Sequence, residues 1–296
     1  MQEKYEIVYS KEFIEKFKKV LLNYYKYETY MDFIIIPFLW KKTLMYIPLL
    51  SYSDRKNDEV EDLLELAKDN DYQIRTLNFE YENFKKDDMV TMRINVKNIE
   101  EIYNSFSQKT RQNINKVKRK NFTHKKGNSD EMIEHFYKIY SETMLRLGTP
   151  ALEKKFFYAL RDEFQEKIYF YNFYDGYKVI AGTCNLLDKE IGVFEWLGMS
   201  ENYKNTNLGY LIFYTLIEFS AKKGLKILDF GRSAYDGGTY RFKKHFKMYP
   251  VKIDVYKPVE EDIYEKYKFA SKIWQKLPKK FVDNFGCKLS KYLKDL

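Results

Sequence analysis

The chain has 296 residues, roughly two domain lengths, and its 45% hydrophobic and 18% aromatic residues can form a sizeable core. The charged fraction of 32% fits a soluble globular protein and excludes a disordered one. Lys and Arg number 52 against 43 Asp and Glu, and the net charge of +9 favours an anionic partner such as phosphate, nucleotide, nucleic acid or an acidic membrane face. A solvated basic surface without a specific partner is also compatible with this charge.

Cysteine and histidine are scarce. Cys184 and Cys287 are far apart, and the three histidines are scattered, so the sequence argues against a metal site and needs no disulfide. The segment "MQEKYEIVYSKEF" lacks the apolar stretch of a signal peptide, and the run "FIIIPFLW" is shorter than the roughly 20 residues that span a bilayer. We therefore expect a cytoplasmic protein. Peripheral contact with the inner membrane face stays an open alternative.

The first part of the chain, up to about residue 96, mixes helix and strand signals. Helical spacing of apolar residues predicts a helix over 10–28. Residues 31–53 read as two strands joined by the "KK" turn, and 58–71 as an amphipathic helix. Further strands are expected in 72–81 and 88–96.

Residues 98–127 change character, because a predicted helix there carries a dense basic cluster. The cluster comprises Lys109, Arg111, Lys116, Lys118, Arg119 and Lys120. This segment is either a solvated connector or an anion-binding helix, and charge alone does not separate the two.

The remaining sequence has a clearer order of elements. We expect helices over 129–147 and 149–164, strands over 167–176, 178–188 and 190–200, a long helix over 205–224, a strand over 225–231, a glycine-rich turn with a basic aromatic helix, and a strand over 250–258. Residues 260–296 are predicted to form a basic helical tail. The fold class is therefore α/β with mixed sheets, divided at 1–97, 98–127, 128–258 and 259–296.

Five stretches in this order carry a family resemblance. They are "IPLLSYSD" (47–54), "SQKTRQNINKVKRKN" (107–121), "RLGTPALEKKFF" (146–157), "DFGRSAYDGGTYRFKKHF" (229–246) and "WQKLPKKFVDNFG" (274–286). With them the chain resembles the FemAB-like branch of the GNAT acyltransferases, and most of all the FemAB-related proteins of PEP-CTERM/exosortase and polysaccharide gene clusters. The resemblance implies two tandem GNAT-like halves.

The resemblance also implies a reaction: transfer of an acyl or aminoacyl group to an amine, without a metal or a tightly bound cofactor. The donor is then a co-substrate, either aminoacyl-tRNA or acyl-CoA or acyl carrier protein. GNAT enzymes hold the CoA pyrophosphate with a glycine-rich loop at a helix N-terminus. The equivalent "KNTNLGYL" (204–211) keeps Gly209 but has Asn205 and Tyr210 where the pattern expects Arg or Gln and Gly or Ala, which argues against acetyl-CoA as the donor. Within this stretch, Asn207 and Gly209 are the expected donor-binding residues.

Three residues are candidates for the chemistry. The resemblance assigns Lys243 to phosphate or the reacting carbonyl, although an amphipathic helix also carries such a lysine on its surface. Asp229 either orients and deprotonates the acceptor amine or forms an ordinary ion pair with an arginine. Glu195 is either a general base or a strand-end acid paired with an arginine.

Further residues are expected to bind the substrates. Arg232 and Ser233 follow a predicted strand end, where α/β proteins commonly place ligands. Arg241 lies in the basic helix just beyond the glycine-rich turn, and the family pattern adds the others. The full set is Arg232, Ser233, Arg146, Thr149, Arg111, Asn113, Arg241 and Trp196. In the same pattern, Arg146 and Thr149 bracket the cleft, and Arg111 and Asn113 clamp a phosphate.

The sequence thus predicts an acyl- or aminoacyl-transferase acting on an amine acceptor in cell-envelope or surface-polysaccharide biosynthesis. The acceptor would be an anionic amino sugar, nucleotide-sugar or glycan or peptidoglycan precursor, and tRNA is one possible donor. The rival hypotheses are a tRNA- or nucleic-acid-binding protein without catalysis and a scaffold that reuses the fold.

Overall fold

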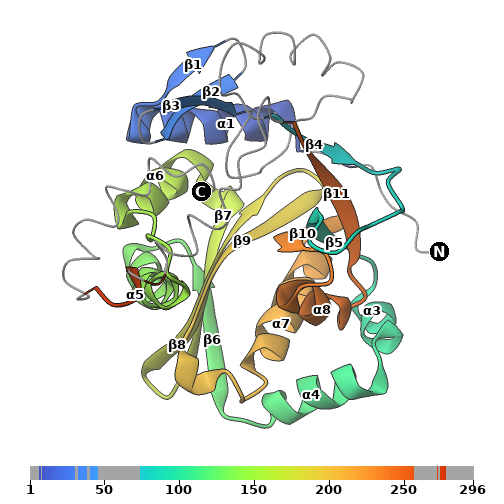
Figure 1. Ribbon diagram of the computed structural model, residues 1–296. Helices are drawn as coiled ribbons and strands as arrows, with labels where there is room; N and C mark the ends of the chain where they lie inside the picture. Colours follow the sequence, from blue (N-terminus) through green and yellow to red (C-terminus); the bar gives the residue numbers. More distant parts are fainter. Residues whose placement is uncertain are drawn as a thin grey trace. The chain divides into compact units, whose positions relative to one another are not determined.

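The computed structural model describes residues 7, 9–30, 33–38, 41–45, 74–256, 272 and 274–277 (Figure 1). The helix expected over 58–71 and the stretch "IPLLSYSD" lie outside the described residues, as does the expected C-terminal tail apart from 272 and 274–277. None of the helices in the described part of the chain is long and apolar enough to cross a membrane.

The chain divides into two compact units, each built from three segments. The first contains Met1–Ser10, Asn78–Ile139 and Glu166–Lys252, and the second contains Lys11–Leu77, Tyr140–Gln165 and Ile253–Leu296. The boundaries that the sequence suggested at 97, 127 and 258 stay a prediction.

An eight-stranded sheet organises the fold, in the order β4-β11-β5-β10-β9-β8-β7-β6. The strands are β4 (Ile74–Asn78), β5 (Met89–Asn95), β6 (Phe122–Gly127), β7 (Ile168–Asp175), β8 (Lys178–Leu187), β9 (Ile191–Met199), β10 (Ile227–Ala234) and β11 (Tyr249–Tyr256). β6 to β9 form an antiparallel meander, β10 joins β9 in parallel, and β5 pairs antiparallel with both β10 and β11. The predicted mixed α/β class is confirmed.

Both faces of this sheet are covered within the first unit, because successive strand residues point to opposite faces. On β7, Phe170 packs on Phe136 of α5 (Asp130–Leu147), whereas the neighbouring Tyr171 packs on Phe219 of α7 (Leu208–Lys222). Helix α7 is buried along most of its length. The two helices that precede β6, α3 (Ile99–Ser105) and α4 (Gln108–Lys118), also contact it (Figure 1). This burial explains its apolar sequence.

The basic segment after residue 97 forms two helices and a strand, whereas a single helix was the clearest sequence signal. Helix α3 (Ile99–Ser105) ends before Ser107, whose hydroxyl accepts from the Thr110 amide and caps α4 (Gln108–Lys118). The residues after α4 are not helical: β6 pairs along its whole length with the aromatic strand β7. The prediction is therefore confirmed for α4 and wrong for 122–127.

The second unit contains a small antiparallel sheet and a helical pair. Strands β1 (Glu28–Tyr30), β2 (Phe33–Phe38) and β3 (Lys41–Met45) form the sheet, and the "KK" pair expected in a turn instead begins β3. Helix α1 (Lys11–Val20) continues into a π-helical turn to Tyr25 and packs on α6 (Lys154–Phe164), where Phe13 meets Phe164 edge to face. The two helices bury apolar stripes that they could not bury alone.

Candidate active site

The parallel strands β9 and β10 pair over three residues only, Ile191–Val193 with Ile227–Asp229. Beyond this point β9 continues along β8, and β10 continues along β5 (Figure 1). We call the place where they part the β9–β10 split. Backbone groups and side chains just past such a split are no longer covered by a neighbouring strand, which makes it a natural place for a ligand.

Each of the two parting strands carries an extra residue at the split. On β9, Phe194 and Trp196 pair with adjacent residues of β8, so Glu195 between them has no cross-strand partner. On β10, Asp229 pairs with Arg93 of β5 and Arg232 pairs with Thr91. Two residues of β10 therefore lie between these pairs where β5 has only one. Such β-bulges redirect side chains and are frequent beside active sites.

Glu195 is the carboxylate at the split. Its side chain is partly exposed, and among the described residues none forms a hydrogen bond or an ion pair with it. Burial raises the pKa of Glu195 to about 7, the Asp229 carboxylate raises it further, and Arg232 and Lys243 oppose the rise. A carboxylate whose pKa lies near neutrality, and which forms no hydrogen bond or ion pair with the described residues, is suited to accept a proton from a substrate.

Asp229 lies one strand away in the opposite environment, with no exposed surface. Its carboxylate accepts from Arg93 Nε at 2.8 Å, Thr91 Oγ1 at 2.5 Å, the Gly231 amide at 2.9 Å and the Tyr9 hydroxyl at 3.4 Å. Arg93 is fully buried as well, and its Nη1 donates to the Ile7 carbonyl at 2.7 Å. The ion-pair alternative is thus present, and the expected role of Asp229 toward the acceptor stays a prediction.

Sequence reasoning missed Arg93 and Thr91, which hold Asp229. The signal was present in strand β5, where Thr91, Arg93 and Asn95 alternate with apolar residues. All three are buried. Polar residues repeated on one face of a buried strand need polar partners, and this pattern predicts a buried network.

Lys243 belongs to the short helix α8 (Gly238–Lys244) that follows β10, and only 4% of its surface is exposed. Its ammonium donates to the carbonyls of Phe230, Gly231 and Arg232 at 2.6, 3.0 and 3.1 Å and to Ser233 Oγ at 3.0 Å. Burial lowers the pKa of Lys243 to about 8, although Glu195 and Asp229 act in the opposite direction. Its expected role at the reacting carbonyl stays a prediction.

The other predicted residues of this strand pair lie around the same point. Arg232 is partly exposed, and its positive charge lies close enough to the candidate base to lower the pKa of Glu195. Ser233 is buried and donates its hydroxyl to the Arg232 carbonyl. Trp196 is buried next to Glu195 in β9.

The two expected donor-binding residues open α7 and are already in contact with protein. Asn207 adopts a left-handed conformation (φ 65°), and its amide donates to Asn113 Oδ1 of α4 at 3.3 Å. A Cβ on Gly209 would lie 3.0 Å from the ring of Phe242, so the glycine permits close approach of α7 and α8. Asn207 and Asn113, predicted separately, are thus brought together.

Three predicted arginines have other contacts or belong elsewhere. Arg111 donates to the carbonyls of Asn104 and Phe106 at 2.9 and 2.5 Å and so caps the end of α3. Arg241 is exposed and forms a two-pronged ion pair with Asp236 at 2.9 and 3.0 Å. Arg146 and Thr149 belong to the second unit, so their expected place beside the cleft stays a prediction.

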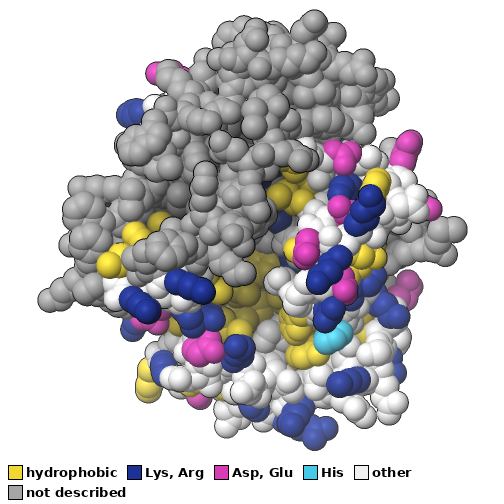
Figure 2. Space-filling view, viewed as in Figure 1, with side chains coloured by type: hydrophobic (Ala, Val, Ile, Leu, Met, Phe, Trp, Pro, Cys, Tyr) yellow, Lys and Arg dark blue, Asp and Glu magenta, His cyan; other side chains and the backbone are white. Residues whose placement is uncertain are grey.

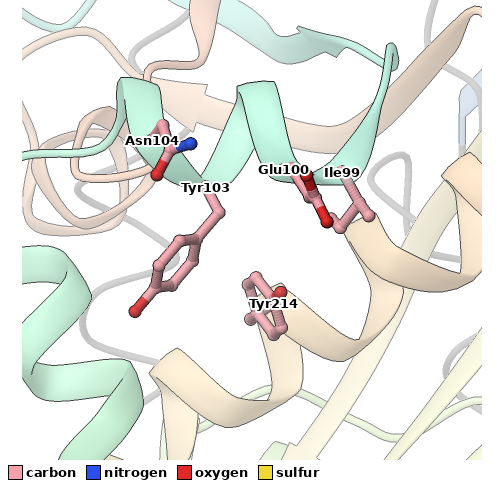
Figure 3. Close-up of a pocket in the computed structure, with 5 residues that line it drawn as sticks. All are labelled: Ile99, Glu100, Tyr103, Asn104 and Tyr214. Atoms are coloured by element: carbon pink, nitrogen blue, oxygen red, sulfur yellow. The ribbon is translucent and has the colours of Figure 1, made fainter.

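A separate small pocket lies between α3 and α7, with a volume of about 260 Å³. Ile99, Glu100, Tyr103 and Asn104 line it from one helix and Tyr214 from the other (Figure 3). The ammonium of Lys118 lies 4.1 Å from the centre of the Tyr214 ring. No sequence prediction falls in this pocket, and it shares no residue with the β9–β10 split.

On the face that Figure 2 shows, positive charge is not gathered into one patch of the described residues. Figure 2 shows Lys and Arg side chains spread over the described part of one face, with acidic side chains among them. Within the described residues, no group of three or more His, Cys, Asp or Glu side chains is arranged to hold a metal ion.

Comparison with known proteins defines the class. Residues 105–244 match the model of the acetyltransferase (GNAT) domain, and residues 7–174 match the model of the FemAB family. The protein is an acyl- or aminoacyl-transferase of GNAT type. Because the second match spans more than half of the sequence, the chain belongs to the FemAB family, as the sequence motifs predicted.

Solved structures share the fold at low identity. FemX is 12% identical with a TM-score of 0.58, over 88% of this chain and 94% of FemX. L-PGS from Bacillus licheniformis is 11% identical with a TM-score of 0.52, over 89% and 97%. The C-terminal domain of a putative lysylphosphatidylglycerol synthetase from Agrobacterium fabrum is 10% identical with a TM-score of 0.52, over 88% and 95%. No curated protein matches the sequence.

Proposed function

We propose that this protein transfers an aminoacyl group to an amine acceptor, with Glu195 as the general base. The observation that carries the proposal is the carboxylate of Glu195, which has no partner among the described residues, stands on a bulge at the β9–β10 split and titrates near pH 7. An amine acceptor is protonated at neutral pH and cannot attack a carbonyl until it loses a proton, and a base of this pKa can take that proton.

The reaction then proceeds without a covalent enzyme intermediate. Glu195 accepts a proton from the acceptor ammonium, and the amine nitrogen attacks the carbonyl carbon of the donor. The carbon–nitrogen bond forms as the tetrahedral intermediate appears. The intermediate collapses by breaking the bond to the leaving oxygen or sulfur. The first proton passes from Glu195 to solvent. Glu195 then takes the second proton from the nitrogen of the tetrahedral intermediate and gives it to the leaving atom, so that a neutral amide forms and Glu195 ends in its starting state.

Arg232 supplies the positive charge of the proposed site. It adjoins Glu195, is partly exposed and has the planar guanidinium that binds phosphate or carboxylate groups. We assign it to an anionic group of the acceptor, of the kind carried by nucleotide-sugars and other glycan precursors. Glu195 and Arg232 together would select a substrate that bears an amine next to an anion.

The start of α7 supports an aminoacyl ester donor over acyl-CoA. Gly209 faces the Phe242 ring, and Asn207 is bonded to Asn113, so this helix end differs from an open glycine loop for pyrophosphate. Membership of the FemAB family and the fold shared with FemX and L-PGS also support this donor. We place the activity in cell-envelope or surface-polysaccharide biosynthesis, in the cytoplasm or at the inner face of the membrane.

A product assay tests the proposal. The purified protein is incubated with mixed aminoacyl-tRNA or acyl-CoA, each combined with UDP-amino sugars or soluble peptidoglycan precursors, and amide products are identified by mass spectrometry. We expect an amide from an aminoacyl-tRNA arm that Glu195→Gln reduces at least a hundredfold. An amide from acyl-CoA alone would overturn the donor assignment. Tight RNA binding without any amide would favour a binding protein instead.

A further inference from the structure

The main chain of β10 makes an unusual turn at the split. In an extended strand, successive carbonyls point to alternate sides. Here Gly231 adopts φ +68°, and the carbonyls of Phe230, Gly231 and Arg232 converge on one atom, Lys243 Nζ. Three carbonyl dipoles aimed at one point repel each other, so a cation at their focus stabilises this backbone shape.

Lys243 provides that cation from inside the protein. Phe242 and Phe246 flank it in sequence and pack on Phe213 of α7, which fixes α8 and leaves the lysine directed at β10. With three N–H groups and four oxygen acceptors in reach, the ammonium has no donor left for a substrate. The side chain is almost completely buried as well.

The turn that Lys243 holds also forms the wall beside Glu195. A Cβ on Gly231 would lie 2.8 Å from Glu195 Oε2, so the bare backbone of the bulge abuts the carboxylate. The shape of this bulge therefore decides where the candidate base can lie.

We propose that Lys243 is a positioning residue: it holds the β10 bulge through the three converging carbonyls and thereby sets the place of Glu195, without contacting the substrate. Only the consequence for catalysis rests on the proposed function. The mechanical part concerns the fold alone and can be tested without a substrate.

Amide hydrogen exchange of the full-length protein, resolved by peptide fragments, is the test. Lys243→Met keeps the length of the side chain and removes its donors, and Lys244→Met is the matched control on the neighbouring, exposed lysine. We expect Lys243→Met to speed exchange of the peptide amides over 230–234 at least tenfold relative to wild type. Lys244→Met should change it less than twofold, and β7 and β8 should stay unchanged in both.

Two results would overturn the proposal. In the first, Lys243→Met exchanges the amides of 230–234 at the wild-type rate but loses activity a hundredfold, which would mean that Lys243 contacts the substrate. The other applies if Lys243→Met does not fold. In that case Ser233→Ala, which removes one of the four acceptors, must speed exchange over 230–234 by about two- to fivefold, and unchanged exchange would contradict a positioning role. A missing transferase activity with faster exchange would reject the proposed function and leave the positioning role intact.

Discussion

Two carboxylates on neighbouring strands of one sheet have opposite environments. Asp229 on β10 has no exposed surface and accepts from four donors, among them a buried arginine. Glu195 on β9 is partly exposed, and no described residue bonds to it. The difference follows from the strand geometry. Asp229 lies where β10 is still flanked by β5 and β9, whereas Glu195 lies on a bulge just past the point where the strands part.

This contrast separates a carboxylate that maintains the site from one that can act in it. The Asp229 carboxylate already accepts from four protein donors, so it has no acceptor position left for a substrate. A carboxylate without partners keeps its proton affinity available. The following changes test the assignment, starting with the largest expected effect.

Replacing Glu195 by Gln should lower kcat/KM by about 10²- to 10⁴-fold, the usual contribution of a general base. The substitution keeps size and shape, so far-UV circular dichroism should not change. In wild type, kcat/KM should rise tenfold per pH unit below about 7 and level off above, because the base works only when deprotonated. The residual activity of the variant should lack this step, and a variant that retains half of the activity would refute the assignment.

Replacing Asp229 by Ala should destabilise the protein by about 3–5 kcal/mol, because it leaves the buried Arg93 without its counter-charge. Urea unfolding measures the loss. The matched control is Asp236→Ala, which breaks the exposed pair with Arg241 and should change the stability far less, because solvent screens this pair. Equal losses in the two variants would mean that the buried network does not stabilise the sheet.

Much of this arrangement was open to prediction from sequence. Element order in the second half and the ordered motifs indicate the family. One of these motifs contains Asp229, Arg232 and Lys243, and Glu195 lies in the strand expected over 190–200. Hydrophobic periodicity identifies helices and strands but does not reveal β-bulges, because a single extra residue leaves the apolar pattern of a strand almost intact. The sequence therefore could not show that Glu195 stands on one bulge or that Lys243 holds another.

Contacts between distant parts of the chain also explain where the other sequence predictions were wrong or incomplete. Lys125 and Lys126 looked like part of a basic connector, but pairing with β7 makes them an edge strand, where lysines are common. Thr91 and Arg93 were assigned to a strand without a role, because their partner is 138 and 136 residues away in sequence. The buried polar residues of β5 indicate that polar partners exist, but no local pattern shows which distant residue supplies them.

Gly231→Ala should destabilise the protein by about 2 kcal/mol, since a side chain is disfavoured at φ +68° and its Cβ would lie 2.8 Å from Glu195 Oε2. Gly238→Ala is the control, because Gly238 opens α8 with open space around it. Thermal unfolding compares the two. In the background of Glu195→Ala the steric part of the cost should disappear, and an undiminished cost there would show that Glu195 does not abut the bulge.

The smallest predicted effect is the loss of folding stability that accompanies a Glu195 pKa of about 7. Its pKa in the folded protein, about 7, lies above the reference value of 4.5, so the folded state binds the proton more tightly than the unfolded state. Wild-type stability should therefore fall as the pH rises from about 4.5 to 7. Gln does not titrate, so Glu195→Gln should be more stable than wild type by about 1 kcal/mol above pH 7, a value kept small because the carboxylate is partly exposed. That gain should shrink toward the lower end of this range, and urea midpoints across pH 4.5–8 measure it. If the gain in stability of Glu195→Gln does not depend on pH, it comes from packing. If the gain follows the titration of Glu195, the same raised pKa that lets this carboxylate act as a base also lowers the stability of the folded protein.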